Sequence, residues 1–222
     1  MDTHTPLTVI ELRRYRTQPG RRDELIALFE REFIESQEAA GMRLPGLFRE
    51  PAEPDRFTWL RGFADMASRA AGLNAFYFGP VWQEFRNAAN ATIDDSDDVL
   101  LLRPSPGLPA LAPAERAAPP RPWRVIVLPL AEPAEATLRD YVATRWLPAL
   151  LQAGAQDLAV FETEPAENNF PRLPVRTDGP VLVLLAAWPS DQSIPGLQAL
   201  EPWLCAEPLV LALQPTARSA RA

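Results

Sequence analysis

A proline-rich segment divides this chain near its middle, and the same order of elements can be traced on either side. The segment runs from Pro104 to Pro122 and holds seven prolines in 19 residues. Because proline fixes its own backbone angle and lacks a backbone donor, such a run favours an extended linker. The sequence therefore predicts a first domain over residues 1–103, a linker over residues 104–122 and a second domain over residues 123–222.

Each half reads as strand, helix, strand, strand, helix, strand. Alternating apolar residues predict the strands, and apolar positions three and four residues apart predict the helices. In the first half we expect strands at 7–15, 44–49, 56–63 and 99–103, and helical segments after Gly20 and over 65–91. In the second half we expect strands at 123–128, 158–164, 181–187 and 208–214, a helix between Pro133 and Gly154, and a helical segment over 194–204.

Corresponding landmarks in the two halves lie at nearly constant distances along the chain. The first strands are about 115 residues apart, Val9 against Arg124, and the glycines that end the first helices, Gly41 and Gly154, are 113 apart. A fixed order repeated once is the mark of a duplication. The sequence therefore predicts an α+β fold of two tandem ferredoxin-like βαββαβ repeats, whose antiparallel sheets lie face to face as in a dimeric α/β barrel.

Side chains alternate along a strand, so each strand of the first half has two different faces. One face of its first and third strands gathers charged and aromatic side chains, namely Glu11, Arg13, Tyr15, Trp59, Arg61 and Phe63. The opposite face of the first strand carries Ile10 and Leu12, and we expect that face to pack against the helices. The charged and aromatic face would then point into the barrel interior.

Two interpretations of this charged face are open. Polar groups cannot be buried without partners, so the cluster is either a ligand pocket or a satisfied ion-pair network. The apolar strands of the second half favour a pocket, because they would add an apolar wall to a polar one. In an enzyme, Glu11 or Tyr15 would move a proton, while Arg61 and Arg13 would stabilise oxyanion charge. Walls for an aromatic substrate would come from Trp59 and Phe63.

The loop from Pro165 to Pro180 is too long for a simple hairpin and is a candidate lid. Asn168, Asn169 and Arg176 could close over a ligand, with the planar fork of Arg176 binding a carboxylate or enolate. An ordinary surface loop is the alternative. Tyr77, beside Gly79 and Pro80, could cap the mouth of the pocket or pack against the core, whereas packing is favoured for Trp82.

The composition argues against several classes of partner. A net charge of −7 and a pI near 4.9 do not suit binding to nucleic acid or to an anionic membrane. The longest apolar run, Val181 to Trp188, is too short to span a bilayer, and we see no secretory signal. The single cysteine, Cys205, excludes an internal disulfide, and its apolar neighbours predict a packed thiol. We therefore expect a cytoplasmic protein.

The sequence predicts neither a metal site nor a cofactor. The only histidine, His4, lies close to the N-terminus, which argues against a histidine triad, a histidine-ligated haem and a histidine zinc site. No glycine-rich phosphate loop is visible. The acidic cluster from Asp94 to Asp98 lacks the spacing of a calcium loop, which favours a solvated turn.

The segment from Arg56 to Pro104 resembles the bacterial branch of the NIPSNAP family, within the dimeric α/β barrel superfamily. The resemblance rests on WLRGF at Trp59–Phe63, on Arg69, on FYFGPVW at Phe76–Trp82, on ANAT at Ala89–Thr92, and on FPRLPVR at Phe170–Arg176 in the second half. It implies a ferredoxin-like fold, a homodimer and a small-molecule pocket in the barrel interior.

We therefore expect a protein that binds a small, partly aromatic, oxygen-bearing molecule, with cofactor-independent proton transfer or oxygenation as its candidate chemistry. The alternative is a non-catalytic metabolite-binding or assembly protein with a structural Glu–Arg network. An open cavity beside Glu11 or Tyr15 would favour the enzyme, and a saturated Glu11–Arg13–Arg61 network without a cavity would favour the alternative. If Glu11 and Tyr15 both lie on the helix side of the sheet, the argument for the pocket fails.

Overall fold

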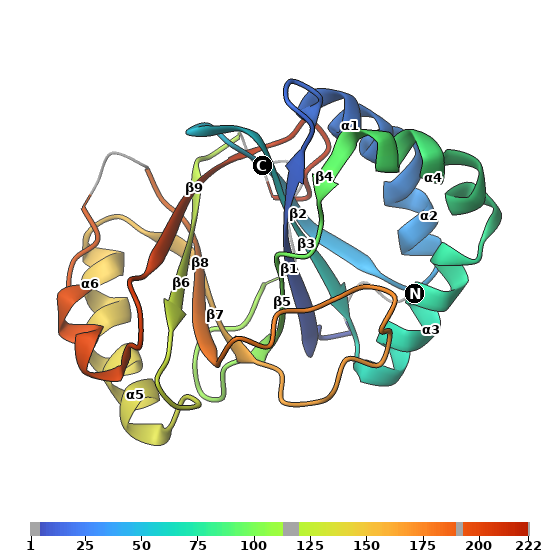
Figure 1. The fold of residues 1–222 in the computed structure, drawn as a ribbon. Helices are drawn as coiled ribbons and strands as arrows, with labels where there is room; N and C mark the ends of the chain where they lie inside the picture. Colours follow the sequence, from blue (N-terminus) through green and yellow to red (C-terminus); the bar gives the residue numbers. More distant parts are fainter. Residues whose placement is uncertain (1–4, 113–119, 190–192, 222) are drawn as a thin grey trace.

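The computed structural model describes residues 5–112, 120–189 and 193–221 (Figure 1). Within the first half, a π-helical turn, η1, interrupts the first helix, and two longer helices follow the third strand. Its elements are β1 (Val9–Thr17), α1 (Arg22–Leu28), η1 (Phe29–Phe33), α2 (Ile34–Ala39), β2 (Arg43–Glu50), β3 (Glu53–Phe63), α3 (Met66–Tyr77), α4 (Pro80–Thr92), β4 (Ile93–Asp95) and β5 (Val99–Pro104).

The second half repeats this order with a shorter second helical crossover. Its elements are β6 (Trp123–Pro129), α5 (Ala136–Tyr141), η2 (Val142–Trp146), α6 (Leu147–Gln152), β7 (Gln156–Thr163), β8 (Val181–Ala187), η3 (Gln198–Trp203) and β9 (Leu209–Pro215). The π-helical turn η2 lies 113 residues after η1, the same spacing that separates the glycines at the ends of these helices. Both glycines, Gly41 and Gly154, have positive φ angles, as expected of helix stops.

Eight of the strands close into one antiparallel barrel. Going around it, the order is β1, β3, β2, β9, β6, β8, β7 and β5, and β5 pairs again with β1. The two repeats are joined by the pairings β2–β9 and β5–β7. The helices of the first repeat cover one side of the barrel, and those of the second repeat cover the opposite side (Figure 1). The expected tandem ferredoxin-like α+β fold is confirmed, and one chain supplies the whole barrel.

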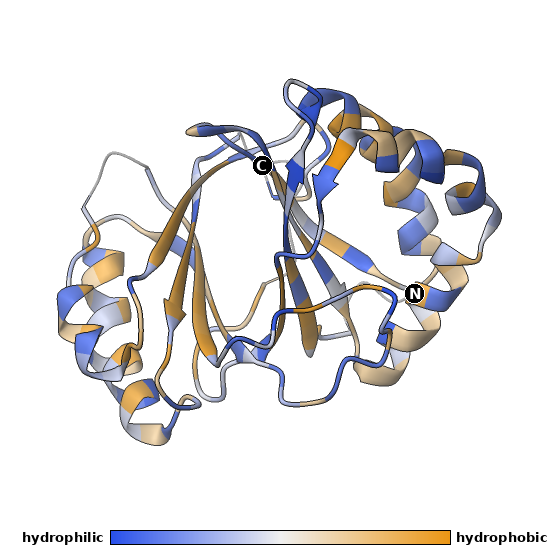
Figure 2. Cartoon of the chain, in the orientation of Figure 1, coloured by the Kyte–Doolittle hydropathy of each residue, from blue (hydrophilic) through white to orange (hydrophobic). Residues whose placement is uncertain are grey.

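Apolar side chains from both repeats fill the barrel interior. Ile10, Leu12 and Leu60 of the first repeat pack there against Trp123 and Val183 of the second. The strands that enclose this space are largely hydrophobic (Figure 2). At the rim, Arg14 and Glu50 form a bidentate pair with N–O distances of 2.7 and 2.8 Å, so these polar groups satisfy each other.

The expected orientation of the first sheet is therefore wrong, and so is the argument that placed a ligand pocket in the barrel interior. The leucine face points into the barrel, and the charged and aromatic face of β1 and β3 lies beneath the helices. The physical reason is the difference between the side chains that pack on the two faces of this sheet. The facing sheet offers only apolar side chains, whereas the helices offer Gln37 and Arg69, which can pair with buried charges.

Two smaller expectations also change. Residues 194–204 form only the short 3-10 helix η3, which holds Pro202 in its interior, where a continuing α-helix would need a backbone donor. Cys205 is exposed rather than packed, because it follows η3 at the surface. His4 and part of the expected linker lie outside the described residues, so the domain boundaries stay predictions. Across the described ranges, no helix is both long enough and apolar enough to cross a membrane.

Closure within one chain can be tested with a cross-link between the repeats. Arg49 on β2 lies directly opposite Gln214 on β9. In a Cys205→Ser background, we expect Arg49→Cys with Gln214→Cys to form an intramolecular disulfide, because paired strands bring the Cβ atoms within bonding range. Non-reducing electrophoresis should show a compact monomer. A covalent dimer would instead mean that the barrel closes between chains.

Candidate functional site

Three arginines converge on the carboxylate of Glu11 beneath the helices of the first repeat. Arg61 donates to Glu11 Oε2 from Nη2 at 2.6 Å and from Nε at 2.9 Å, and Arg13 Nη1 donates to the same oxygen at 2.9 Å. Arg69 Nε donates to Glu11 Oε1 at 2.8 Å. Arg69 Nη2 lies 2.7 Å from that oxygen, but the contact is an ion pair and not a second hydrogen bond. All four side chains are fully buried.

The local structure fixes each member of this Glu11 cluster. In the β1–β3 register, Glu11 lies opposite Arg61 and Arg13 lies opposite Trp59, so two cross-strand pairs place these side chains under the helices. Arg69 comes from the first turn of α3, whose start is set by Asp65, because the Asp65 carboxylate accepts a hydrogen bond from the backbone of Ser68. The cluster is therefore held by a sheet and a capped helix.

The electrostatics assign different roles to Glu11 and Tyr15. Burial alone would raise the pKa of Glu11, but the attraction of the three arginines outweighs it and lowers that pKa to about 2. Burial raises the pKa of Tyr15, although Arg13 opposes this change. Arg13 Nε donates to Tyr15 Oη at 3.0 Å, which leaves the Tyr15 hydroxyl hydrogen for another acceptor. Tyr15 is thus better placed than Glu11 to exchange a hydrogen with a ligand.

A cavity of about 100 Å³ adjoins the cluster between the sheet and the helices. Half of its 14 described lining residues are aromatic. The lining residues are Tyr15, Leu25, Phe29, Phe33, Gln37, Trp59, Phe76, Tyr77, Trp82, Ala89, Asn90, Ile93, Ser96 and Leu173. Arg61 connects the cluster to this wall, because its Nη1 lies 3.2 Å from Gln37 Oε1 and 3.4 Å from Tyr77 Oη. The site therefore combines an aromatic enclosure with an adjacent cationic cluster.

The long loop of the second repeat lies against this site of the first repeat (Figure 1). Asn169 accepts a hydrogen bond from Arg69 Nη1 at 2.7 Å and donates one to the carbonyl of Met66 at 2.6 Å. Asn168 accepts from the same Arg69 nitrogen at 3.0 Å. Phe170 stacks on Tyr77 with ring centroids 5.7 Å apart. Residues 168–173, the strap, thus connect the two repeats and close one side of the cavity.

The structure brings most of the predicted site residues together. Those at the cluster or the cavity are Glu11, Arg13, Tyr15, Trp59, Arg61, Tyr77 and Asn169. Phe63 lies beneath the Arg61 guanidinium, 5.8 Å from it, and does not line the cavity. Arg176 points away from the cavity, since its guanidinium pairs with Asp98 and Asp178.

Sequence reasoning missed several members of the site. Arg69 was noted only within a family motif, although an arginine on the inward side of a helix of small residues could have been recognised as a partner for Glu11. Gln37 gave a similar signal, because it is polar and follows Phe33 by one turn on the buried face of the helix. Leu173 could not have been found, since its place depends on the path of the strap.

The second repeat shows that the fold does not require the cluster. With the offset of 115 residues between β1 and β6, the Glu11–Arg61 pair corresponds to the Ile126–Leu184 pair in the β6–β8 register. Ile126 and Leu184 belong to an apolar core beneath α5 and α6. The same architecture is thus built with apolar side chains at the positions that hold charges in the first repeat.

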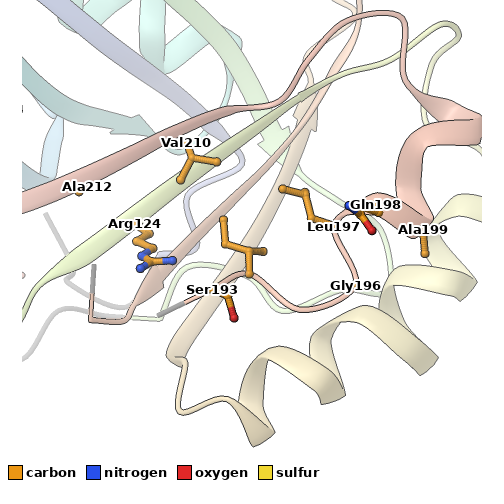
Figure 3. Close-up of a pocket in the computed structure, with 9 residues that line it drawn as sticks. Arg124, Ser193, Gly196, Leu197, Gln198, Ala199, Val210 and Ala212 are labelled. Carbon is orange, nitrogen blue, oxygen red and sulfur yellow. The ribbon is translucent and has the colours of Figure 1, made fainter. Parts of the chain in front are cut away.

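A larger open hollow of about 650 Å³ lies on the outer face of β6 and β9 (Figure 3). There the six-residue η3 is the counterpart of the 12-residue α3 and the 13-residue α4 of the first repeat. The lining is mostly apolar, and the guanidinium of Arg124 lies 4.6 Å from the ring centroid of Trp188. The hollow follows from the shortened crossover and contains no counterpart of the Glu11 cluster.

Comparisons with known proteins find matches to the first half of the chain and to the whole chain. Residues 10–106 match the model of the NIPSNAP family. A NIPSNAP-like domain protein from Burkholderia xenovorans is 27% identical, covers 50% of this chain and 96% of its own, and has a TM-score of 0.43. No curated protein matches the chain.

Several solved structures match nearly the whole chain, among them the following two. A putative monooxygenase from Fusobacterium nucleatum covers 95% of this chain and 93% of its own, with 6% identity and a TM-score of 0.60. An anthrone oxidase-like protein covers 99% of this chain and 96% of its own, with 13% identity and a TM-score of 0.58. At these identities the similarity establishes the tandem barrel fold alone.

The Glu11 carboxylate should stabilise the fold in a pH-dependent way. Its pKa lies near 2 in the folded protein and near 4.5 in the unfolded chain, so its contribution is complete above about pH 4.5 and is lost as the pH falls toward 2. At neutral pH we expect Glu11→Gln to lower the free energy of unfolding by about 3 kcal/mol. Denaturant unfolding between pH 7 and pH 3 should show this difference shrinking.

A matched control is Glu24→Gln, which removes an exposed carboxylate on α1 and should change stability little. If the stability difference between wild type and Glu11→Gln stays constant from pH 7 to pH 3, the buried carboxylate does not have the lowered pKa described here.

Proposed function

We propose that this chain, whose residues 10–106 form a NIPSNAP domain, binds a small, partly aromatic, oxygen-bearing molecule between the sheet and the helices of that domain. The observation that carries the proposal is the presence of the Glu11 cluster beside the aromatic cavity in one repeat only. A purely structural network would be expected at equivalent positions of both repeats, because in both repeats helices pack on the same side of an antiparallel sheet. Asymmetry after duplication therefore supports one ligand site.

The shape of the cavity supports a flat, compact ligand. Its walls are mainly ring edges and faces, such as those of Phe29, Trp59 and Trp82, which favour stacking with an aromatic ring. Its volume of about 100 Å³ suits a single ring. A larger ligand would require the strap to move, since Leu173 forms part of the wall.

The candidate chemistry is cofactor-independent proton transfer or oxygenation. The hydroxyl of Tyr15 would bind a substrate oxygen, while Arg13 and Arg61 would stabilise the negative charge that forms when a neighbouring C–H loses its proton. Glu11 would act as a positioning residue that orients the arginines. The putative monooxygenase and anthrone oxidase-like neighbours support oxygenation as the first chemistry to test.

The oxygenation can be written without a cofactor. A CH₂ group beside a carbonyl loses a proton to a water molecule to give a carbanion, and this carbon then forms a bond to dioxygen. The resulting peroxide takes up the released proton, and the hydroperoxide loses water to leave a carbonyl. Overall, CH₂ and O₂ become C=O and H₂O. Dioxygen is the oxidant, and the protein supplies binding and charge stabilisation.

The alternative function is non-catalytic binding of a metabolite, or assembly. The small volume of the cavity and the many contacts made to Glu11 are compatible with this alternative. A homodimer and a cytoplasmic location also remain proposals. The barrel does not depend on a second copy, because one chain supplies all eight strands.

Ligand binding can be tested by a thermal-shift screen of small aromatic, carboxylic and quinone-like compounds. We expect a compound that stabilises the wild type to lose its effect in Arg61→Leu, because the cationic contact is removed. Leu184→Ala is the matched control at the equivalent position of the second repeat. It should lower the melting temperature but leave the ligand-induced shift unchanged. A shift retained in Arg61→Leu would contradict the proposed site.

The strap should control the rate of exchange with the cavity. Asn169→Ala removes its hydrogen bonds to Arg69 and Met66, so we expect a bound compound to dissociate several-fold faster, as measured by stopped-flow fluorescence of the cavity tryptophans. Asn74→Ala, on the exposed side of α3, is the control. Equal dissociation rates in wild type and Asn169→Ala would argue against a lid role for the strap.

A further inference from the structure

The Glu11 cluster contains more positive than negative charge. Arg13, Arg61 and Arg69 contribute three positive charges, and Glu11 is their only carboxylate partner among the ion pairs of the described residues. Three guanidinium groups against one carboxylate leave a net charge of about +2 in a fully buried cluster. The other groups that contact it, including Gln37, Asn168 and Asn169, supply neutral acceptor oxygens.

This excess charge is costly for the protein by itself. Buried ions lose their hydration, and their attraction to a partner offsets the loss only where a partner exists. Burial lowers the pKa of Arg69, and repulsion by Arg61 and Arg13 acts in the same direction against the attraction of Glu11. The cluster in its unliganded form is therefore electrostatically incomplete.

Three hydrogen-bond donors at the site have no hydrogen-bond partner, and one of them, Arg69 Nη2, still forms an ion pair with Glu11. Arg13 Nη2 and Trp59 Nε1 are buried and have no hydrogen-bond partner. Trp59 lines the cavity, and the Arg13 guanidinium lies 5.3 and 5.5 Å from the ring centroids of Tyr15 and Trp59, two of its walls. Buried donors are paired in the great majority of native structures. Trp59 thus forms part of the cavity wall, and Arg13 packs against two of the wall residues, Tyr15 and Trp59.

The second repeat again shows that these donors are not needed for folding. The Arg13–Trp59 pair of the β1–β3 register corresponds to the Leu128–Leu182 pair of the β6–β8 register. Both leucines are fully buried in the apolar core of the second repeat. At these equivalent positions, the buried charge and the donors without partners therefore occur only in the repeat that contains the aromatic cavity.

We infer that the molecule bound in the cavity is an anion, an aromatic ring that carries at least one ionised oxygen as a carboxylate, phenolate or enolate. This inference rests on the proposed function and narrows its ligand class. Ionised oxygens accept several hydrogen bonds and supply the missing negative charge. A neutral molecule of the same shape would leave the net charge of the cluster unchanged.

The test compares anions with neutral molecules of the same shape. Calorimetry should show that benzoate and salicylate bind at least tenfold more tightly than benzamide and salicylamide. A second readout uses 4-nitrophenol, whose phenolate absorbs visible light. At a pH where this compound is half ionised, adding the protein should increase the phenolate absorbance, because the site favours the anion.

Arg13→Met provides an independent readout that needs no ligand. If Arg13 stabilises the fold, its removal should lower the melting temperature. If Arg13 instead serves to bind an anion, it adds unbalanced positive charge to the unliganded protein, and its removal should raise the melting temperature. We therefore expect Arg13→Met to raise the melting temperature of the unliganded protein and to abolish the preference for benzoate over benzamide. Leu128→Met, at the equivalent position of the second repeat, should change neither the preference nor the phenolate signal.

The outcomes separate the two proposals. If the amides bind as tightly as the carboxylates, the anion inference is overturned and the proposed pocket stands. If Arg13→Met lowers the melting temperature and keeps the preference for anions, the assigned role of the buried charge is wrong. If neither the anions nor the neutral compounds bind, both the pocket and the anion inference fail.

Discussion

The mutual burial of two sheet faces is the constraint on which the rest of this structure depends. Each ferredoxin-like sheet has helices on one side only, so its other face must be covered by a second sheet or remain exposed. Here the two inner faces meet inside one chain, and the pairings β2–β9 and β5–β7 close the barrel. Closure leaves no free edge along the eight strands.

This constraint also decides where a polar site can lie. The space between the two sheets is filled by apolar side chains such as Leu12 and Val183, which cannot pair with charges. The space under the helices is different, because side chains of α2 and α3 reach the sheet there. Glu11 and Arg61 are therefore stable beneath the helices and would not be stable in the barrel interior.

Duplication then allowed the two repeats to diverge. The second repeat keeps the strands and the π-helical turn but fills the equivalent space with apolar side chains, as at Ile126 and Leu184. Its long strap instead reaches the site of the first repeat through Asn168 and Asn169. The second repeat thus completes the barrel and closes the cavity of its neighbour.

The sequence by itself determined the elements and their order, because strand alternation and helix stops are local properties. The strand predicted at 181–187 matches β8, and Gly41 and Gly154 end their helices as expected. Alternation also grouped Glu11 with Arg13 and Arg61 with Trp59, since residues two apart share a face. Local patterns failed at 194–204, where Pro202 allowed only a short 3-10 helix.

Only the tertiary structure decided which way each face points. A charged face and a leucine face are equally consistent with either side of a sheet until the partners of each are known, and those partners are distant in sequence. Arg69 is 58 residues from Glu11, and Asn169 is 100 residues from Arg69. The candidate site depends on these long-range contacts, which is why alternation could name its residues but could not place them.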